Sequence, residues 1–180
     1  MEIVNFFEKL AGRWFSQRTT HALSTQQSKA GKSDLEVAFL ASDAAEVQTL
    51  CASLDESDNG SATPLCGLQI QQSSTIEGDT KPSVLTTLMV PFAPDSPASN
   101  HGKLLSSSGT TQDIKQSAYT LEDDVLTIVT KDNQAQSSER IWFINDNLRM
   151  RTGVTELADG LRIASFCSEI RLGVKPPKPD

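Results

Sequence analysis

Charged side chains recur at every second position within three strand-like runs in the last third of this chain. The runs cover residues 139–143, 148–152 and 164–171. Because residues two apart share one face of a strand, neighbouring strands would line one surface with Glu139, Arg149, Arg151, Glu169 and Arg171. Such a surface is too polar for a dry core and too regular for loops. The alternation therefore predicts a cavity lined by ionic groups.

The length and hydropathy of the chain set limits on its organisation. A chain of 180 residues is long enough for one domain with a sizeable core and short for two. We expect a single domain over residues 1–174, followed by a flexible Pro-rich tail over residues 175–180. No apolar run approaches the roughly 20 residues that cross a bilayer, so we expect no membrane insertion.

The charge and the reactive residues exclude several classes of function. A net charge of −7 opposes nucleic-acid binding, which needs clustered Lys and Arg. The acidic Glu2 stands where a secretory signal would be basic, and three cysteines without metal-type spacing fit a reducing compartment. We therefore expect a cytoplasmic protein. His21 and His101 form no constellation for a metal or a hydrolytic triad, so we expect no metal.

Local periodicity predicts a mainly β chain with two short helices. Apolar spacings of three and four place the helices at residues 2–10 and 43–54. Strand patterns occur at residues 13–23, 33–40, 66–72, 83–90, 103–107, 117–122, 125–130, 137–144, 148–154 and 162–172. We expect Ala30 and Gly31 to form the first turn. About ten short strands joined by hairpin turns favour an up-and-down antiparallel barrel, and a β-sandwich is the alternative.

Four segments of the chain resemble the S/U-type phycobiliprotein bilin lyases. The segments are Arg13 to Thr19, Glu139 to Phe143, Asn147 to Thr152 and Ala164 to Gly173. The resemblance implies a lipocalin-like barrel that carries an open-chain phycobilin to an apo-phycobiliprotein subunit and promotes a thioether bond to a cysteine of that partner. It implies a lyase without a prosthetic group, with phycocyanobilin or phycoerythrobilin as its substrate. The working form would be a homodimer or a heterodimer with a related lyase subunit.

The same resemblance, together with strand alternation, suggests which residues hold the bilin. A phycobilin carries two propionates, and the planar fork of arginine pairs well with a carboxylate. We therefore assign Arg18, Arg149 and Arg151 to the propionates. Surface ion pairs are the alternative fate of these arginines. Trp14 shares the parity of Arg18 and would stack on a pyrrole ring, unless it packs in the core.

Glu139 and Glu169 are the candidate catalytic acids. A carboxyl group in a partly apolar cavity has a raised pKa and can hydrogen-bond the pyrrole nitrogens or protonate the bilin. Protonation would make the bilin more electrophilic toward the cysteine of the partner. The alternative for either glutamate is a salt bridge to Arg149 or Arg151 that orders the barrel wall.

Two functions remain open at this point. The first is an active lyase that binds a bilin and delivers it to a specific cysteine. The second is a non-catalytic, lipocalin-like bilin-binding or chaperone subunit of a heterodimeric lyase, because in some members of the family two related subunits act together. The chain has no tryptophan between Trp14 and Trp142, where the family pattern has one in the central strands, so the second function is kept.

Overall fold

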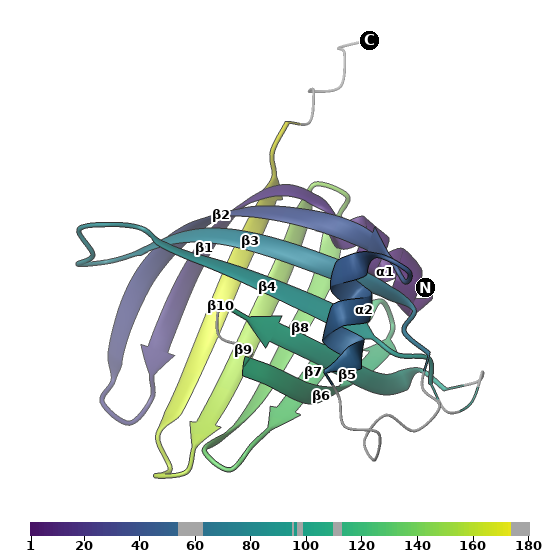
Figure 1. The fold of residues 1–180 in the computed structure, drawn as a ribbon. Helices are drawn as coiled ribbons and strands as arrows, with labels where there is room; N and C mark the ends of the chain where they lie inside the picture. The colour runs from purple at the N-terminus through teal and green to yellow at the C-terminus, as the bar shows by residue number, and fades with distance from the viewer. Residues whose placement is uncertain (54–62, 95, 97–98, 110–112, 174–180) are drawn as a thin grey trace.

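The protein is a closed antiparallel barrel of ten strands with one helix at its end and one on its side (Figure 1). A computed structural model describes residues 1–53, 63–94, 96, 99–109 and 113–173. The helices are α1 (Ile3–Leu10) and α2 (Ala45–Ala52). The strands are β1 (Gly12–Ala22), β2 (Gln27–Ala41), β3 (Cys66–Ile76), β4 (Ser83–Pro91), β5 (His101–Ser108), β6 (Asp113–Glu122), β7 (Val125–Lys131), β8 (Ala135–Asn145), β9 (Leu148–Leu157) and β10 (Arg162–Arg171). The predicted lipocalin-like barrel is confirmed, and the sandwich is excluded.

Each strand pairs with the strands that precede and follow it in the sequence, and β1 pairs with β10 to close the barrel. One predicted turn is wrong. Ala30 and Gly31 lie within β2, opposite Thr19 and Arg18 of β1. The chain reverses earlier, where Gln26 takes a φ of 55°, and β2 therefore begins at Gln27, six residues before the predicted start at Ser33.

The inside and outside of the barrel alternate along every strand, as the pleat of a sheet requires. In β2, Ser33, Leu35 and Val37 are buried while Asp34 and Glu36 are exposed. The inward side chains near one end of the barrel are apolar and form one core cluster with α1. Toward the other end, the inward positions carry hydroxyl, amide and ionic groups instead. The interior is therefore dry at one end and polar at the other.

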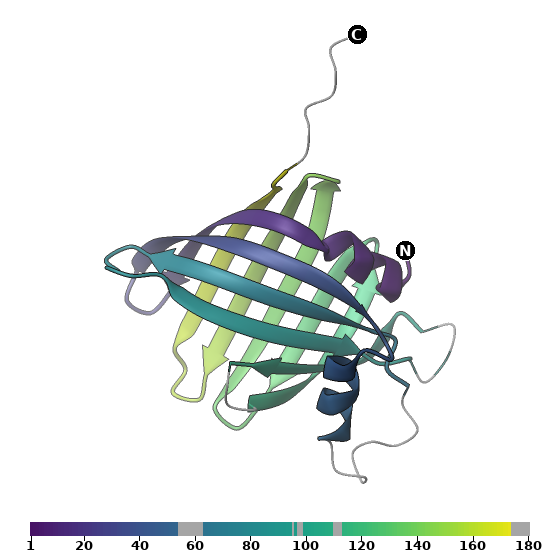
Figure 2. The same cartoon turned by 45° about the horizontal axis from the view of Figure 1, so that its top comes forward.

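Helix α1 plugs the apolar end of the barrel (Figure 2). Its residues Ile3, Phe6, Phe7 and Leu10 recur at helical spacing and all point into the core. Phe6 and Phe7 are 0% exposed, and the Phe6 ring meets the ring of Phe143 edge-on at 5.5 Å between centroids. The N-terminal segment thus makes one end of the barrel a closed floor and leaves the other end as the mouth.

Helix α2 packs on the outside of the wall and forms a second, smaller core. Val47 and Leu50 of α2 contact Val90, Phe92 and Leu105, which come from the β4 and β5 region. The helix approaches β3 so closely that a Cβ on Gly67 would lie 2.5 Å from Val47 Cγ2. Glycine at position 67 therefore permits this packing. The mouth and the interior of the barrel are not covered by α2.

Two further expectations concern the termini and the membrane. The Pro-rich tail predicted at residues 175–180 lies outside the described residues. Among the residues that are described, no helix has the length and apolar character needed to span a membrane.

The plug makes a testable contribution to stability. Phe6→Ala should lower the free energy of unfolding by about 3–5 kcal/mol, because a large buried ring leaves a cavity behind. Asn5→Ala, on the exposed face of the same helix, is the matched control and should change stability by less than about 0.5 kcal/mol. Urea unfolding followed by circular dichroism measures both. Equal stability of the two variants would contradict the role of α1 as part of the core.

Candidate functional site

The polar interior is organised in rows of inward side chains, which lie side by side on the neighbouring strands β8, β9, β10 and β1. Starting from the plug, the floor row consists of Phe143, Arg149, Glu169 and Ser16. The arginine row, one step nearer the mouth, consists of Ile141, Arg151, Cys167 and Arg18. The acid row, the next step, consists of Glu139, Gly153, Ser165 and Thr20. Successive rows are about 7 Å apart, because they are two residues apart along each strand.

The floor row is held together by the carboxylate of Glu169. One of its oxygens accepts a hydrogen bond from Arg149 Nε in a direct ion pair. The other accepts from Ser16 Oγ at 3.2 Å and lies 3.7 Å from Arg151 Nη2. Glu169 is 1% exposed and Arg149 is 5% exposed. The predicted alternative of a salt bridge that orders the wall is therefore present for Glu169.

Trp14 lies between two arginines beneath the floor row. The guanidinium carbons of Arg149 and Arg171 are each 4.2 Å from the centroid of its ring, a distance at which a cation is attracted to an aromatic face. Trp14 is 0% exposed, and its Nε1 donates to the Leu10 carbonyl at 2.9 Å. The faces of this indole are already occupied by protein, so the core-packing alternative for Trp14 is the one that the structure contains.

The two arginines also hold the C-terminal end of α1. Arg149 Nη1 donates to the Leu10 carbonyl at 3.1 Å. Arg171 donates from Nη1 to Ala11 O at 2.6 Å and from Nη2 to Lys9 O at 2.8 Å. The last carbonyls of a helix lack partners within the helix and carry partial negative charge. Cations from β9 and β10 therefore fasten the plug to the barrel.

The pKa that we expected for Glu169 is wrong in direction. Burial by itself raises the pKa of this carboxyl, but the charges of Arg151 and Arg149 and the hydrogen bonds from Arg149 and Ser16 outweigh burial and lower it below its ordinary value. Glu169 is therefore ionised at neutral pH and carries no proton that it could donate to a ligand. The expectation of a raised pKa assumed partly apolar surroundings, whereas the structure has the alternative, a salt bridge to Arg149.

Arg151 and Arg18 are the two cations of the arginine row. Burial lowers the pKa of Arg151, but Glu139 and Glu169 raise it, and the net result is a raised pKa. Arg18 lies opposite Gly31, and a Cβ on Gly31 would be 3.9 Å from Arg18 Nη2. Within the part of the chain that the structure describes, Arg18 forms no ion pair with a carboxylate. The strands that carry the two arginines are separated only by β10, so their backbones are about 10 Å apart.

The side chain between these arginines is a cysteine. Cys167 is 1% exposed, and burial raises the pKa of its thiol, although Arg151 lowers it in part. A buried thiol with a raised pKa is a poor nucleophile. All three cysteines of the chain are free. Cys167 is therefore best described as a small packing residue.

The acid row leaves open space beside a carboxylate. Gly153 lies between Glu139 and Ser165 in the row, and a Cβ there would be 2.9 Å from Ser165 Oγ and 3.8 Å from Glu139 Cγ. Glycine inside a strand often marks close approach by a ligand or another backbone. The absence of a side chain at Gly153 gives a ligand in the barrel direct access to Glu139.

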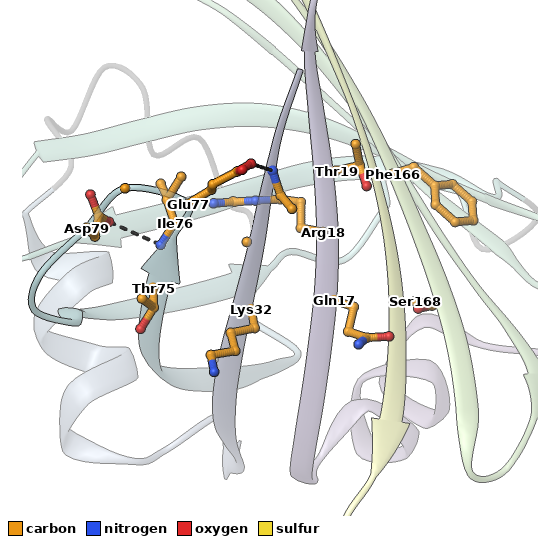
Figure 3. Close-up of a pocket in the computed structure, with 13 residues that line it drawn as sticks. Gln17, Arg18, Thr19, Lys32, Thr75, Ile76, Glu77, Asp79, Phe166 and Ser168 are labelled. Carbon is orange, nitrogen blue, oxygen red and sulfur yellow. Dashed lines mark hydrogen bonds between the residues drawn. The ribbon is translucent and has the colours of Figure 1, made fainter. Parts of the chain in front are cut away.

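Two hollows meet at Arg18. An inner hollow of about 320 Å³ lies in the mouth and is lined by Arg18, Thr20, Lys29 and Ile163, among others. An outer hollow of about 760 Å³ lies on the outer side of the wall, along β1, β2 and the β3–β4 turn (Figure 3). Figure 3 shows the Arg18 side chain extending from β1 past β2 toward Ile76 and Glu77. Arg18 therefore borders both spaces.

Residues 2–172 match the family model described as CpeS-like protein. A chromophore lyase CpcS/CpeS from Thermosynechococcus vestitus is 38% identical over 179 residues, which cover 98% of this chain and 96% of the relative. The chain belongs to the CpeS-like family. A chromophore lyase CpcS/CpeS from Trichodesmium erythraeum is 35% identical over 95% of this chain and 98% of its own length.

A solved structure shares the barrel of this CpeS-like chain. The S-type phycobiliprotein lyase CPES from Guillardia theta superposes with a TM-score of 0.80 and 24% identity, over 97% of this chain and 95% of that chain. At this identity the likeness concerns the fold. The relatives and the matched family model agree with the resemblance drawn from the four sequence segments, which is confirmed.

The structure brings the sequence-predicted residues together in one region, although at different depths. Glu139, Arg18 and Arg151 face the mouth half, whereas Arg149, Glu169 and Trp14 form the floor. The sequence reasoning missed the contribution of Ser16 to Glu169 and the positions of Gly153 beside Glu139 and of Gly31 beside Arg18. Only the two glycines gave a signal, because glycine is unusual inside strands. Among the described residues, no group of three or more His, Cys, Asp or Glu side chains is placed to hold a metal ion.

The buried pair in the floor row should give a pH-dependent stability. Glu169→Gln should lower the free energy of unfolding at pH 7 by about 3 kcal/mol, because Arg149 is left as an uncompensated buried charge. The folded-state pKa of Glu169 is lowered, so its stabilisation is complete above the unfolded pKa of about 4.3 and is lost as the pH falls through the folded value. The wild type should therefore lose more stability between pH 6 and pH 3 than the variant.

Urea unfolding at several pH values measures this difference. Glu156→Gln removes a carboxylate from an exposed pair with Arg162 and is the matched control, with an expected change of less than about 1 kcal/mol. Parallel pH profiles of wild type and Glu169→Gln would refute the role of Glu169 in the floor.

Proposed function

We propose that this chain is a phycobiliprotein chromophore lyase, which binds an open-chain bilin in the mouth half of the barrel and promotes its thioether attachment to a cysteine of an apo-phycobiliprotein subunit. The observation that carries the proposal is the arginine row with the acid row above it. Two cations stand at one level of the wall, and the carboxylate of Glu139 stands one step nearer the mouth. The names of the relatives support the same activity.

Arg18 and Arg151 are the residues we assign to the two propionates. Both are partly exposed and inward-facing, and the Arg151 side chain is 24% exposed. The two propionates lie on the two central rings of an open-chain tetrapyrrole, so two arginines whose backbones are about 10 Å apart at one level of the sheet suit them. A guanidinium can pair with each carboxylate through two hydrogen bonds. The bilin would then be oriented with its end rings free of the arginines.

Glu139 is the residue we assign to the pyrrole nitrogens. Its charge helps to raise the pKa of Arg151, and it stands one row nearer the mouth than that arginine. A carboxylate that accepts hydrogen bonds from N–H groups stabilises the protonated, more electrophilic form of the conjugated system. The partner's thiolate then adds to the ethylidene carbon, forming the carbon–sulfur bond, and a proton is delivered to the ring carbon of the former double bond. No group leaves, and nothing is oxidised or reduced.

We assign Arg149, Glu169 and Trp14 to positioning, which revises the roles first expected for them. Arg149 is engaged by Glu169, by the Leu10 carbonyl and by the Trp14 ring. Glu169 is shared between Arg149 and Arg151. It therefore fixes Arg151, which contacts the bilin in this proposal, and keeps that arginine charged and in place without touching the ligand.

A second candidate function is a bilin-binding subunit that needs a sister lyase subunit for transfer. One observation favours it: a relative from Picosynechococcus, 27% identical over 95% of this chain, is named phycocyanobilin lyase subunit CpcS. That name also favours phycocyanobilin over phycoerythrobilin as the bilin.

We place the protein in the cytoplasm, because its three cysteines are free and would stay so in a reducing compartment.

Bilin affinity tests the propionate assignment. Arg18→Ala and Arg151→Ala should each weaken noncovalent bilin binding by about 1.5–3 kcal/mol, the usual worth of a charge-assisted hydrogen bond. Absorption titrations with phycocyanobilin and phycoerythrobilin give the dissociation constants. Arg140→Ala, on the outward face of β8 next to Ile141, is the matched control and should bind as the wild type does. Unchanged affinity in both mouth variants would remove the assignment.

Covalent transfer tests the catalytic assignment. Purified protein, bilin and each apo-subunit should yield a fluorescent adduct without a second lyase subunit. Glu139→Gln should retain bilin binding but slow adduct formation by about 100-fold, the usual range for a group that manages a proton. The exposed Glu122→Gln is the control and should transfer normally. An adduct that forms only after a sister subunit is added would establish the second candidate instead.

A further inference from the structure

We propose that the outer hollow is the docking site for the segment of the acceptor protein that bears the cysteine. The inference rests on the proposed function and adds to it the surface that the protein partner uses. The outer hollow is bounded by outward positions of β1 and β2, by the turn after β3 and by β10 (Figure 3). Its volume of about 760 Å³ lies in the range that holds a ligand of a few side chains.

The position of the outer hollow is the first argument. It shares Arg18, Ala30, Gly31 and Ile76 with the inner hollow of the mouth. The pairing of β2 with β3 ends at Gly31 and Ile76, and beyond this point the β1–β2 and β3–β4 hairpins diverge (Figure 1). A notch therefore connects the outer surface with the space where the bilin is proposed to lie, and Arg18 stands at its base.

The charges of the outer hollow are the second argument. Its two acids are used within the protein: Glu77 Oε2 accepts from Ala30 N at 3.4 Å, and Asp79 Oδ2 accepts from Ile76 N at 3.1 Å. Its two cations, Lys32 and Arg18, form no ion pair with any carboxylate in the described ranges. Because Arg18 is assigned to a bilin propionate, Lys32 is the cation of this lining that is left for a partner, in a chain with a net charge of −7. A segment with an acidic side chain beside its cysteine complements this surface.

The remaining lining suits a peptide and not a second bilin. Gln17, Thr19 and Thr75 offer amide and hydroxyl groups to a peptide backbone, and Phe166, 45% exposed, forms an apolar rim beyond β1. Neither Glu139 nor Arg151 lines the outer hollow, because both point into the barrel from β8 and β9. A bilin in the outer hollow would meet one arginine, and the two acids there, Glu77 and Asp79, already accept backbone hydrogen bonds, so that space is left for the protein substrate.

The geometry gives the partner's thiol a short path to its target. A segment lying in the outer hollow brings its cysteine to the notch, where the two hollows share Arg18, Ala30, Gly31 and Ile76. The addition itself is the balanced step described above, in which the sulfur bonds to the ethylidene carbon and a proton goes to the ring carbon. Docking contributes by holding the two reactants in place, and such positioning supplies a large part of the rate enhancement in bimolecular reactions.

Direct binding of the acceptor tests the proposal apart from catalysis. The probes are fluorescently labelled apo-phycobiliprotein subunits whose acceptor cysteine is replaced by serine, added to the bilin-loaded protein and followed by fluorescence anisotropy. Lys32→Glu and Phe166→Ala should each raise the dissociation constant for the recognised subunit about tenfold. Lys131→Glu and Val129→Ala lie at exposed positions of β7 across the barrel. The first makes the same charge reversal, the second also truncates an exposed apolar side chain to alanine, and each should alter the dissociation constant less than twofold.

The outcomes separate this inference from the proposed function. Absorption titration of each variant with the bilin should give wild-type affinity, because Lys32 and Phe166 do not line the barrel interior. If bilin binding is intact and the Lys32 and Phe166 variants hold the acceptor as tightly as the β7 controls do, the docking site is wrong while the lyase proposal stands. If the wild type binds no acceptor subunit, the docking site is also wrong. If the wild type binds no bilin, the proposed function itself fails.

Discussion

The carboxylate of Glu169 is the group on which the rest of the interior depends. It is buried among two arginines and a serine hydroxyl, and a carboxylate at this depth is tolerable only when its charge is paired and its lone pairs are used. The two arginines paired with Glu169 also reach other parts of the barrel. Arg149 continues to the end of α1 and to Trp14, whereas Arg151 faces the open half of the barrel. One buried negative charge therefore links the plug of the barrel to the wall of the proposed bilin site.

The barrel is asymmetric along its axis, and the asymmetry decides where a ligand can bind. At the plugged end, aromatic and aliphatic side chains from α1 and the strands pack without polar gaps. Toward the mouth, hydroxyl pairs such as Ser33 with Ser74, 2.8 Å apart, and Ser117 with Thr130, 2.7 Å apart, replace them. Hydroxyl groups on the wall lose little hydrogen-bond energy when a polar ligand displaces water from them, because the ligand can replace those hydrogen bonds. The dry end supplies stability, and the polar end is left for binding.

The fold could be predicted from the sequence because apolar and polar residues alternate along the strands and turn residues separate them. At the β6–β7 hairpin, for example, Asp123 and Asp124 take positive φ values of 49° and 59°, as such a tight turn requires. The residues of the site were predicted, but their depth in the barrel was not. Strand parity shows that Arg149 and Arg151 share a face, yet it cannot show that one meets a helix carbonyl while the other faces the mouth. That distinction depends on the plug, whose contacts come from the opposite end of the chain. Gly31 was misread as a turn residue because its place within β2, opposite Arg18 of β1, appears only when the strands are paired.

The fastening of α1 has a consequence for how the chain reaches its folded state. The arginines that hold the last carbonyls of this helix come from β9 and β10, 139 to 162 residues later in the chain. Its apolar face has no complete enclosure until those strands exist. Contacts between such distant positions slow folding, because a large loop must be ordered before they form. During synthesis the apolar face of α1 therefore stays exposed until β9 and β10 have emerged and paired, and only then is this end of the barrel closed.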